Sequence, residues 1–141
     1  MQRHGGNYLE NAGGKQMGIK LDMVGLVVQD MKKALDFYRV LGFAIPEQAN
    51  EEQHVEVAQD GVRLAFDTVE IAKSVYGGWE PASGHRIELA FLCDDAAALD
   101  ALYAKIVEHG YESHREPWDA VWGQRYAIVK DPDGNLISLF A

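Results

Sequence analysis

The chain has 141 residues and a formal net charge of −9; 48 % of its residues are hydrophobic and 25 % are charged. This balance is typical of a soluble globular protein, and the length fits one compact domain or two very small modules that share a core. Acids outnumber bases by 22 to 13, so we expect neither a nucleic acid nor a membrane surface as a partner, because both require clustered Lys and Arg. No hydrophobic run approaches the roughly 20 residues of a membrane span. The single cysteine, Cys93, allows no intrachain disulfide, which favours a cytoplasmic location.

Residues 1–18 are predicted to form a leader or N-terminal arm. The stretch "MQRHGGNYLENAGGKQ" is rich in Gly and Asn and shows no hydrophobic periodicity, and Met17 offers an alternative start. We therefore expect a single folded domain over residues 19–141.

The first half of this domain begins with a predicted strand, "LDMVGLVVQD", in which hydrophobic residues alternate between two faces. Asp30 at its end can cap the next segment, "MKKALDFYRVLGF", which has helical spacing and stops at Gly42. Two short alternating strands then surround a turn at Asp60-Gly61, which predicts a hairpin.

The second half repeats this order. A strand "IELAFLCDD" precedes a helix "AAALDALYAKIVEHG", and a hairpin with a turn at Asp133-Gly134 follows. Aligning Asp30 with Asp95 superposes the hydrophobic stripes of the two strands. The pattern predicts an α+β protein made of an internal βαβββ repeat, with modules at about residues 19–80 and 85–141.

With these elements in place, the chain resembles the vicinal oxygen chelate superfamily of glyoxalases, bleomycin-resistance proteins and extradiol dioxygenases. The resemblance is carried by "VVQDMKKALDFYRVLGF", "LAFLCDDAAALDALYAKIVEHGY" and "DPDGNLISLF". It implies tandem βαβββ modules whose strands curve into a cup with the helices outside, and a homodimer. It does not imply one activity, because the scaffold hosts many.

The resemblance also implies where a metal would bind. At the four positions where metal-dependent members place His, Gln or Glu, this chain has Met23, Ala65, Glu88 and Ser138. Only Glu88 is a good ligand for a hard divalent ion, because a thioether and a neutral hydroxyl bind such ions weakly. We therefore expect no cofactor and disfavour a divalent metal, and we place the sequence nearest to the metal-free, bleomycin-resistance-like members.

The histidines do not supply the missing ligands, since none of the five falls at a matching position of the cup. His109 ends a predicted helix, where a cation suits the helix dipole. We expect His54, His85 and His114 at the surface or at an interface.

The strand alternation predicts a mostly apolar cup with a few charges, which is the usual composition of a small-molecule pocket. Arg63 either forms ion pairs with Glu88 or Asp67, or it contacts a ligand, and the sequence leaves both alternatives open.

The segment "PWDAVWGQRY" combines two tryptophans with charged residues, and its Pro, Asp and Gly predict a loop. Nearby Tyr76 and Trp79 add further aromatic surface. The tryptophans of such a loop need to be buried against other groups, and we expect the loop at the mouth of the cup or at the dimer interface. The complete set of predicted ligand-binding residues is Arg63, Asp67, Glu88, Trp118, Trp122, Arg125, Tyr126, Ser138 and Phe140.

Three hypotheses for the function follow. The first is a binding protein that sequesters an aromatic or cationic small molecule in a metal-free cup. The second is a lyase, isomerase or dioxygenase with non-standard metal ligands, or with Glu88, the only catalytic candidate, as a general base. The third is an interaction module with a vestigial cup. No nucleophile motif, phosphate loop or paired-cysteine motif is present.

Overall fold

The computed structural model describes residues 18–141, so the predicted arm lies, apart from Gly18, outside the described residues. In chain order the elements are β1 (Met23–Val28), α1 (Met31–Leu41), the 3-10 helix η2 (Glu47–Glu51), β2 (His54–Gln59), β3 (Val62–Thr68), α2 (Val69–Tyr76), β4 (Glu88–Leu92), α3 (Ala96–Glu108), β5 (Ser113–Asp119), β6 (Arg125–Lys130) and β7 (Leu136–Phe140).

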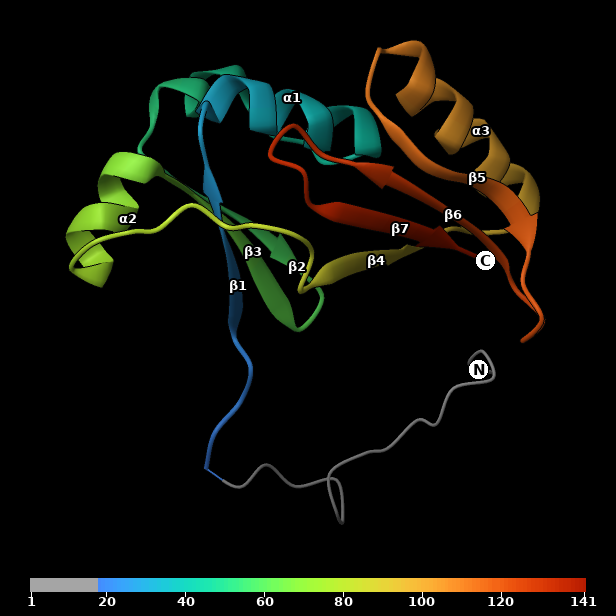
Figure 1. Ribbon diagram of the computed structural model, residues 1–141, viewed down its shortest axis with the longest axis horizontal. Coiled ribbons are helices and arrows are strands. Elements are labelled where there is room, and N and C mark those ends of the chain that lie inside the picture. The colour runs from blue at the N-terminus through green and yellow to red at the C-terminus, as the bar shows by residue number, and fades with distance from the viewer. Residues whose placement is uncertain (1–17) are drawn as a thin grey trace.

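The strands form two sheets, one with the order β1-β3-β2 and one with the order β4-β7-β6-β5 (Figure 1). In each sheet the first strand of the module pairs in parallel with the last one, and the remaining pairs are antiparallel. Helices α1 and α3 cover the same side of the two sheets (Figure 1). The predicted α+β class with strands on one side and helices on the other is therefore confirmed.

The two helices begin where the sequence predicts. Asp30 accepts a hydrogen bond from the backbone N–H of Lys33 at 2.9 Å, and Asp95 accepts one from Ala98 at 2.8 Å. These equivalent caps satisfy N–H groups that have no partner inside the helix. Helix α1 ends at Gly42, whose φ of 130° is open to glycine without strain.

A single hydrophobic core joins the two halves of the chain. It combines buried residues of α1, such as Leu35 and Phe37, with Leu64 and Phe66 of β3 and with residues of α3, β6 and β7. One sheet face in each module is therefore hydrophobic and covered by helices, as the alternation predicts.

The turn of residues 131–135 holds α1 against the second module. The Tyr38 hydroxyl donates to Asp131 Oδ2 at 2.7 Å, and the Gln29 N–H donates to Asp133 Oδ1 at 3.0 Å. The Asp131 Oδ1 atom accepts from the N–H groups of Asp133 and Asn135, which fixes the turn itself. The turn therefore also connects the two modules.

The first module differs from the predicted βαβββ pattern because it has three strands. The chain after α1 passes through an extended stretch into η2 and forms no ladder with β2. Pro46 has no N–H to donate, and the Arg39 guanidinium binds the carbonyls of Ile45 and Pro46 at 2.9 Å each. In place of a fourth strand, these contacts hold the stretch to α1.

Two further segments differ from the predictions. Helix α2 was not predicted, although the Thr68 hydroxyl caps it and Gly77 ends it in a left-handed conformation. The first part of "PWDAVWGQRY" was predicted as a loop but belongs to strand β5. Pro117 is tolerated there because β5 is an edge strand, in which one N–H group can be missing. Within residues 18–141, no helix is long and apolar enough to cross a membrane.

Candidate functional site

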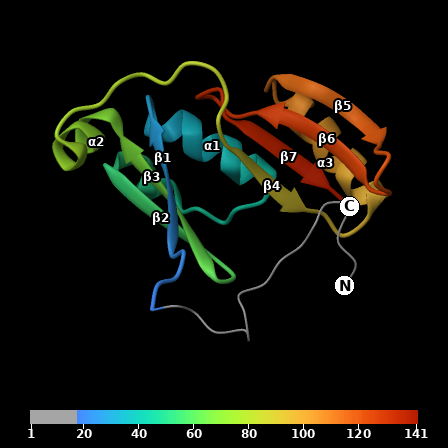
Figure 2. The same ribbon diagram turned by 60° about the horizontal axis from the view of Figure 1, so that its bottom comes forward.

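We call the side of the two sheets that points away from α1 and α3 the cup face; Figure 2 shows it in front of the helices. In each strand, the residues that alternate with the core-facing ones have their side chains on this face, as predicted. In the first sheet they are Met23, Gly25, Val27, Arg63, Ala65 and Asp67, and in the second sheet Glu88, Ala90, Leu92, Ser138 and Phe140.

A carboxylate and two hydroxyl groups meet on the cup face of the second sheet. The Ser138 hydroxyl donates to Glu88 Oε2 at 2.5 Å. Partial burial raises the pKa of the neighbouring Tyr126, and the charge of Glu88 acts in the same direction, while a hydrogen bond with Ser138 opposes the shift. Glu88 is exposed, and no ion pair involving it occurs among the described residues. This position therefore offers a negative charge to a ligand.

Four aromatic side chains lie against one another on the same sheet; we call Trp118, Trp122, Tyr126 and Phe140 the aromatic group. Of these, Tyr126 hydrogen-bonds Ser138, the partner of Glu88. The ring centroid of Tyr126 lies 5.3 Å from that of Trp118, 5.5 Å from that of Trp122 and 6.2 Å from that of Phe140. Tyr126 and Phe140 are nearly parallel, at 26°, whereas the two tryptophans meet Tyr126 at steeper angles. Tyr126 is thus the centre of a continuous aromatic surface.

Strand register and one tight turn create this surface. Trp118, Tyr126 and Phe140 are direct neighbours across β5, β6 and β7. The turn between β5 and β6 is closed by the Ala120 N–H, which donates to the Gln124 carbonyl at 2.7 Å. Trp122, inside this turn, donates from Nε1 to Gln124 Oε1 at 3.0 Å and lies against Tyr126. The Arg115 guanidinium lies 3.5 Å from the centroid of the Trp118 ring, so this surface already holds one cation.

The cup face of the first sheet carries a separate set of charges, which we call the charged cluster. Arg63 pairs with Glu56 and Asp22, both at 2.5 Å, and His54 contacts Asp67 at 2.5 Å and Glu56 at 2.7 Å. The partners of Arg63 are therefore not those the sequence predicted, and Asp67 pairs with a histidine instead. Sequence reasoning missed His54 and Glu56, although their alternation along β2 with the buried Val55 and Val57 was a usable signal.

The charged cluster raises the pKa of His54. The hydrogen bond with Glu56 is the largest cause and the one with Asp67 the next, and both favour the charged imidazolium. His54 should therefore stabilise the fold at pH values below about 6.5, where it is also charged in the unfolded chain, and lose this contribution as the pH rises through its folded pKa.

This pH dependence is testable with a His54→Gln variant. The difference in urea midpoint between wild type and variant should favour wild type at about pH 5.5 and shrink at about pH 9. The same difference at both pH values would show that the imidazolium has no stabilising role.

Arg125 does not belong with the other predicted site residues. Its guanidinium binds Asp100 of α3 and Asp119 of β5, each at 3.1 Å at the closest, on the side of β6 opposite Tyr126. The prediction did not resolve which face of β6 each residue takes, and a shift of one residue reverses that face. Tyr76 and Trp79 also lie apart from the aromatic group: Tyr76 ends α2, and Trp79 lines a cavity of about 480 Å³ that borders β1 and β4.

The residues present do not fit a divalent metal at the cup face. Met23 and Ala65 offer no hard donor, and the Ser138 hydroxyl is bound to Glu88. Across residues 18–141, no group of three or more His, Cys, Asp or Glu side chains is arranged to hold a metal ion. Both ring nitrogens of His54 face carboxylates, which leaves that imidazole no free lone pair when it is protonated.

Comparison with known proteins agrees with this architecture. A family model described as the Glyoxalase/Bleomycin resistance protein/Dioxygenase superfamily matches residues 20–139. The protein YraH of Bacillus subtilis (strain 168) is 27 % identical over 128 residues, which are 86 % of this chain and 98 % of that protein.

Solved structures share the fold at lower identity. A glyoxalase/bleomycin resistance protein/dioxygenase family enzyme from Burkholderia phytofirmans PsJN matches with a TM-score of 0.75 at 20 % identity, over 86 % of this chain and 98 % of that one. A lactoylglutathione lyase from Agrobacterium tumefaciens matches with a TM-score of 0.63 at 17 % identity, over 89 % and 95 %. At this identity these likenesses show the fold alone.

Proposed function

Because this chain belongs to the glyoxalase/bleomycin resistance protein/dioxygenase superfamily, we propose that it binds a small planar cation on the cup face of its second sheet, without a metal. The observation that carries the proposal is the aromatic group, whose Tyr126 is connected to Glu88 through Ser138. A planar ring can stack on Tyr126 and Phe140 while its positive charge lies toward the carboxylate.

The charge distribution supports a cationic ligand over an anionic one. Glu88 has a hydroxyl partner but no cationic one among the described residues, and the chain as a whole carries −9. An anionic ligand would be repelled both by the Glu88 carboxylate and by the net charge of the chain, whereas a cation is attracted by both.

Substitution of Tyr126 tests the site directly. Tyr126→Ala should weaken binding of the planar cation proflavine at least about fivefold, because one aromatic contact is worth about 1–3 kcal/mol. The matched control is Tyr76→Ala, which removes the same side chain from an exposed position on α2 and should leave the affinity unchanged. Isothermal titration calorimetry gives both values, and an equal loss in the two variants would count against the site.

Removal of the charge tests the ligand class. Glu88→Gln keeps the size of the side chain and should reduce the affinity for proflavine about tenfold while leaving that for the neutral, similarly planar acridone within about twofold. Equal losses for both compounds would mean that the residue acts through packing rather than charge.

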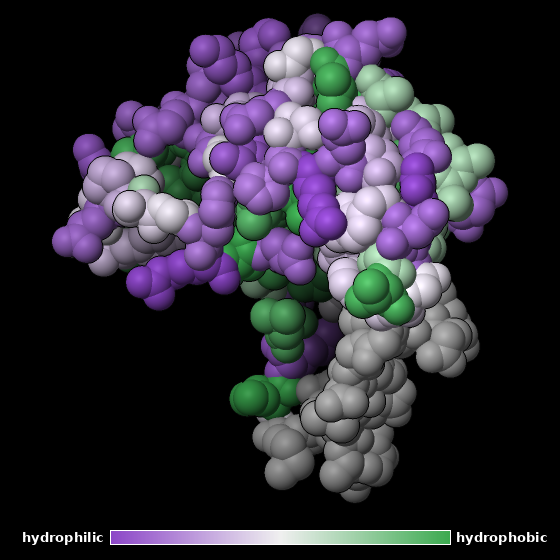
Figure 3. All heavy atoms as spheres, turned by 45° about the vertical axis from the view of Figure 1, so that its right-hand side comes forward, coloured by the Kyte–Doolittle hydropathy of each residue, from purple (hydrophilic) through white to green (hydrophobic). Residues whose placement is uncertain are grey.

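We also propose a homodimer in the cytoplasm. Ile19, Leu21, Met23 and Leu92 are exposed hydrophobic residues at or beside the cup face, and Figure 3 shows exposed hydrophobic groups in the lower part of the molecule. A second copy would cover them and enclose the ligand. Light scattering coupled to size exclusion should then give twice the chain mass of 15.7 kDa.

An enzyme is the second candidate, and the hydrogen bond between Ser138 and Glu88 favours it. A carboxylate fixed in this way beside the raised-pKa Tyr126 can accept a proton from a bound carbon acid. Solvent deuterium should then exchange into a ketone substrate in the presence of the protein. Glu88→Gln should abolish this exchange, and retention of full exchange would remove the candidate.

A further inference from the structure

The first sheet ends one strand earlier than the second. Strand β2 pairs with β3 on one side, and no described strand pairs with its other side. Its counterpart in the second sheet, β6, has β5 as an antiparallel neighbour at that place. Since both sheets otherwise have the same order, β2 presents an edge where the fold accommodates one more strand.

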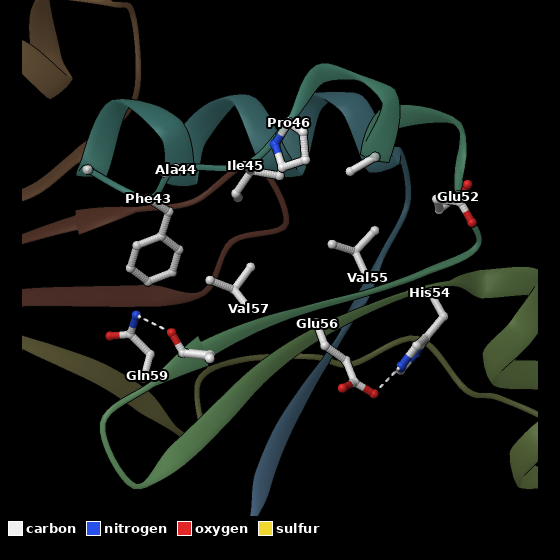
Figure 4. A pocket seen from close by; sticks show the side chains of 13 residues that line it. Phe43, Ala44, Ile45, Pro46, Glu52, His54, Val55, Glu56, Val57 and Gln59 are labelled. Atoms are coloured by element: carbon white, nitrogen blue, oxygen red, sulfur yellow. Dashed lines mark hydrogen bonds and ion pairs between the residues drawn. The ribbon is translucent and has the colours of Figure 1, made fainter.

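A groove runs along this edge. A cavity of about 600 Å³ is lined by all residues of β2 and by the stretch of residues 42–46 that follows α1. Figure 4 shows Phe43, Ile45 and Pro46 on one side of the groove and Val55 and Val57 on the other. Its wall on the helix side is therefore apolar.

The backbone groups that face the groove follow from the hydrogen bonds of β2. The Thr68 N–H donates to the Gln53 carbonyl, and in an antiparallel ladder the bonded residues alternate. Val55 and Val57 then pair inward with β3, whereas the N–H and C=O groups of His54, Glu56 and Ala58 point outward.

One side-chain contact agrees with this assignment. The Ala58 carbonyl accepts a hydrogen bond from Gln59 Nε2 at 3.1 Å, as an outward-facing group can. The three alternate residues thus provide donors and acceptors for an added strand of about six residues.

We propose that this edge binds an extended peptide segment of a partner protein, which adds antiparallel to β2 in the place that β5 takes beside β6. In such an arrangement, side chains of the added strand alternate between the two faces of the sheet. Those on the helix side pack against Phe43 and Ile45. Those on the cup side lie beside Glu56, which already meets Arg63 and His54. The exposed Glu52 and Asp60 near the two ends of the strand have no ion pair among the described residues and supply the negative charge. The partner segment therefore alternates apolar and basic residues.

Charge argues against a second copy of this chain as the occupant. Pairing of β2 with itself would bring Glu56, Glu52 and Asp60 of the two copies together, and like charges across strands destabilise a sheet. A basic segment would instead be attracted by these acidic side chains.

The experiment uses the full chain and a capped hexapeptide of alternating Val and Lys, followed by amide hydrogen exchange in NMR spectra. Without peptide, the N–H groups of His54, Glu56 and Ala58 should exchange fast and those of Val55 and Val57 slowly. A millimolar concentration of the peptide should slow the three fast amides by about tenfold or more.

Modified peptides distinguish strand addition to β2 from a non-specific electrostatic attraction of the peptide to the acidic protein. In an antiparallel pair the residues opposite His54, Glu56 and Ala58 are the lysines on the cup side, and these form the bonds to β2. N-methylation of the lysines should abolish the protection, whereas N-methylation of the valines should preserve it. A Val–Glu hexapeptide should have no effect.

Two substitutions in the protein give an independent test. Ala58→Pro removes an outward N–H without touching the ladder with β3, so it should abolish peptide protection at His54 and Glu56 while the circular dichroism spectrum is retained. Gln59→Ala releases the Ala58 carbonyl and should strengthen peptide binding a few-fold. If Ala58→Pro does not fold, the N-methylated peptides make the same distinction on the unchanged protein.

Several results would overturn the proposal. One is no protection by the Val–Lys peptide, and another is equal protection by both N-methylated forms or by the Val–Glu peptide. Protection in the protein alone that rises with its concentration would assign the edge to a second copy. Concentration-independent protection that is lost when residues 1–17 are removed would assign it to the chain's own N-terminal segment.

Discussion

Replacement of Asp131 by alanine should destabilise the protein by about 4 kcal/mol, a large part of the roughly 5–15 kcal/mol that holds a domain of this size. The Asp131 carboxylate accepts four hydrogen bonds: from the Tyr38 hydroxyl, from the N–H groups of Asp133 and Asn135, and from the Asn135 side-chain amide. Asp131 is 5 % exposed and Tyr38 is fully buried, so water cannot replace the lost partner. Burial and the nearby carboxylate also raise the pKa of Tyr38, which keeps its hydroxyl a donor.

Urea denaturation measures this loss, and Tyr38→Phe provides the control. That variant removes one of the four bonds and should cost about 1.5 kcal/mol in the wild-type background. In the Asp131→Ala background the same change should cost almost nothing, because the tyrosine hydroxyl has already lost its partner. Additive effects of the two substitutions would show that the bond does not connect α1 to the second module.

Replacement of Phe37 by alanine should cost about 3–5 kcal/mol. Its ring is fully buried in α1 and meets the rings of Tyr38 and Tyr111 edge to face, with centroids at 5.0 Å in both cases. Truncation leaves a cavity at the point where α1 packs between the modules, and the aromatic contacts on both sides are lost.

Matched substitutions show whether this cost comes from the cavity. Phe37→Leu retains most of the volume and should cost less than about 1.5 kcal/mol, and Tyr76→Ala at the exposed end of α2 should change stability by less than about 0.5 kcal/mol. The free energies follow from urea midpoints at equal slope. A Phe37→Ala value close to that of Tyr76→Ala would contradict the packing described here.

Much of the fold could be predicted because its signals are local. Alternation identified which residues of β1 and β4 face the core, and Asp30 marked the start of α1 as its predicted cap. The same alternation placed Glu88 and Ser138 on the cup face, since the side-chain direction in a strand has a period of two, but their contact depends on the pairing of β4 with β7.

The missed features depend on contacts between distant residues. The stretch that takes the place of a fourth strand in the first module is held to α1 by Arg39, which binds the carbonyls of Ile45 and Pro46. No periodicity in the sequence indicates this contact. The pairing of His54 with Asp67 depends on the register of β2 against β3. Arg125 was assigned to the site because its neighbours are aromatic. Its side chain points to the other face of β6, where it binds Asp100 of α3 and Asp119 of β5.

The central claim is that a planar cation binds at the aromatic group beside Glu88, and mapping proflavine binding by NMR tests it most directly. We expect the largest chemical-shift changes at Trp118, Tyr126, Ser138 and Phe140, and we expect Glu88→Gln to reduce all of them together. Shift changes confined to the cavity beside Trp79, or to the groove along β2, would contradict it.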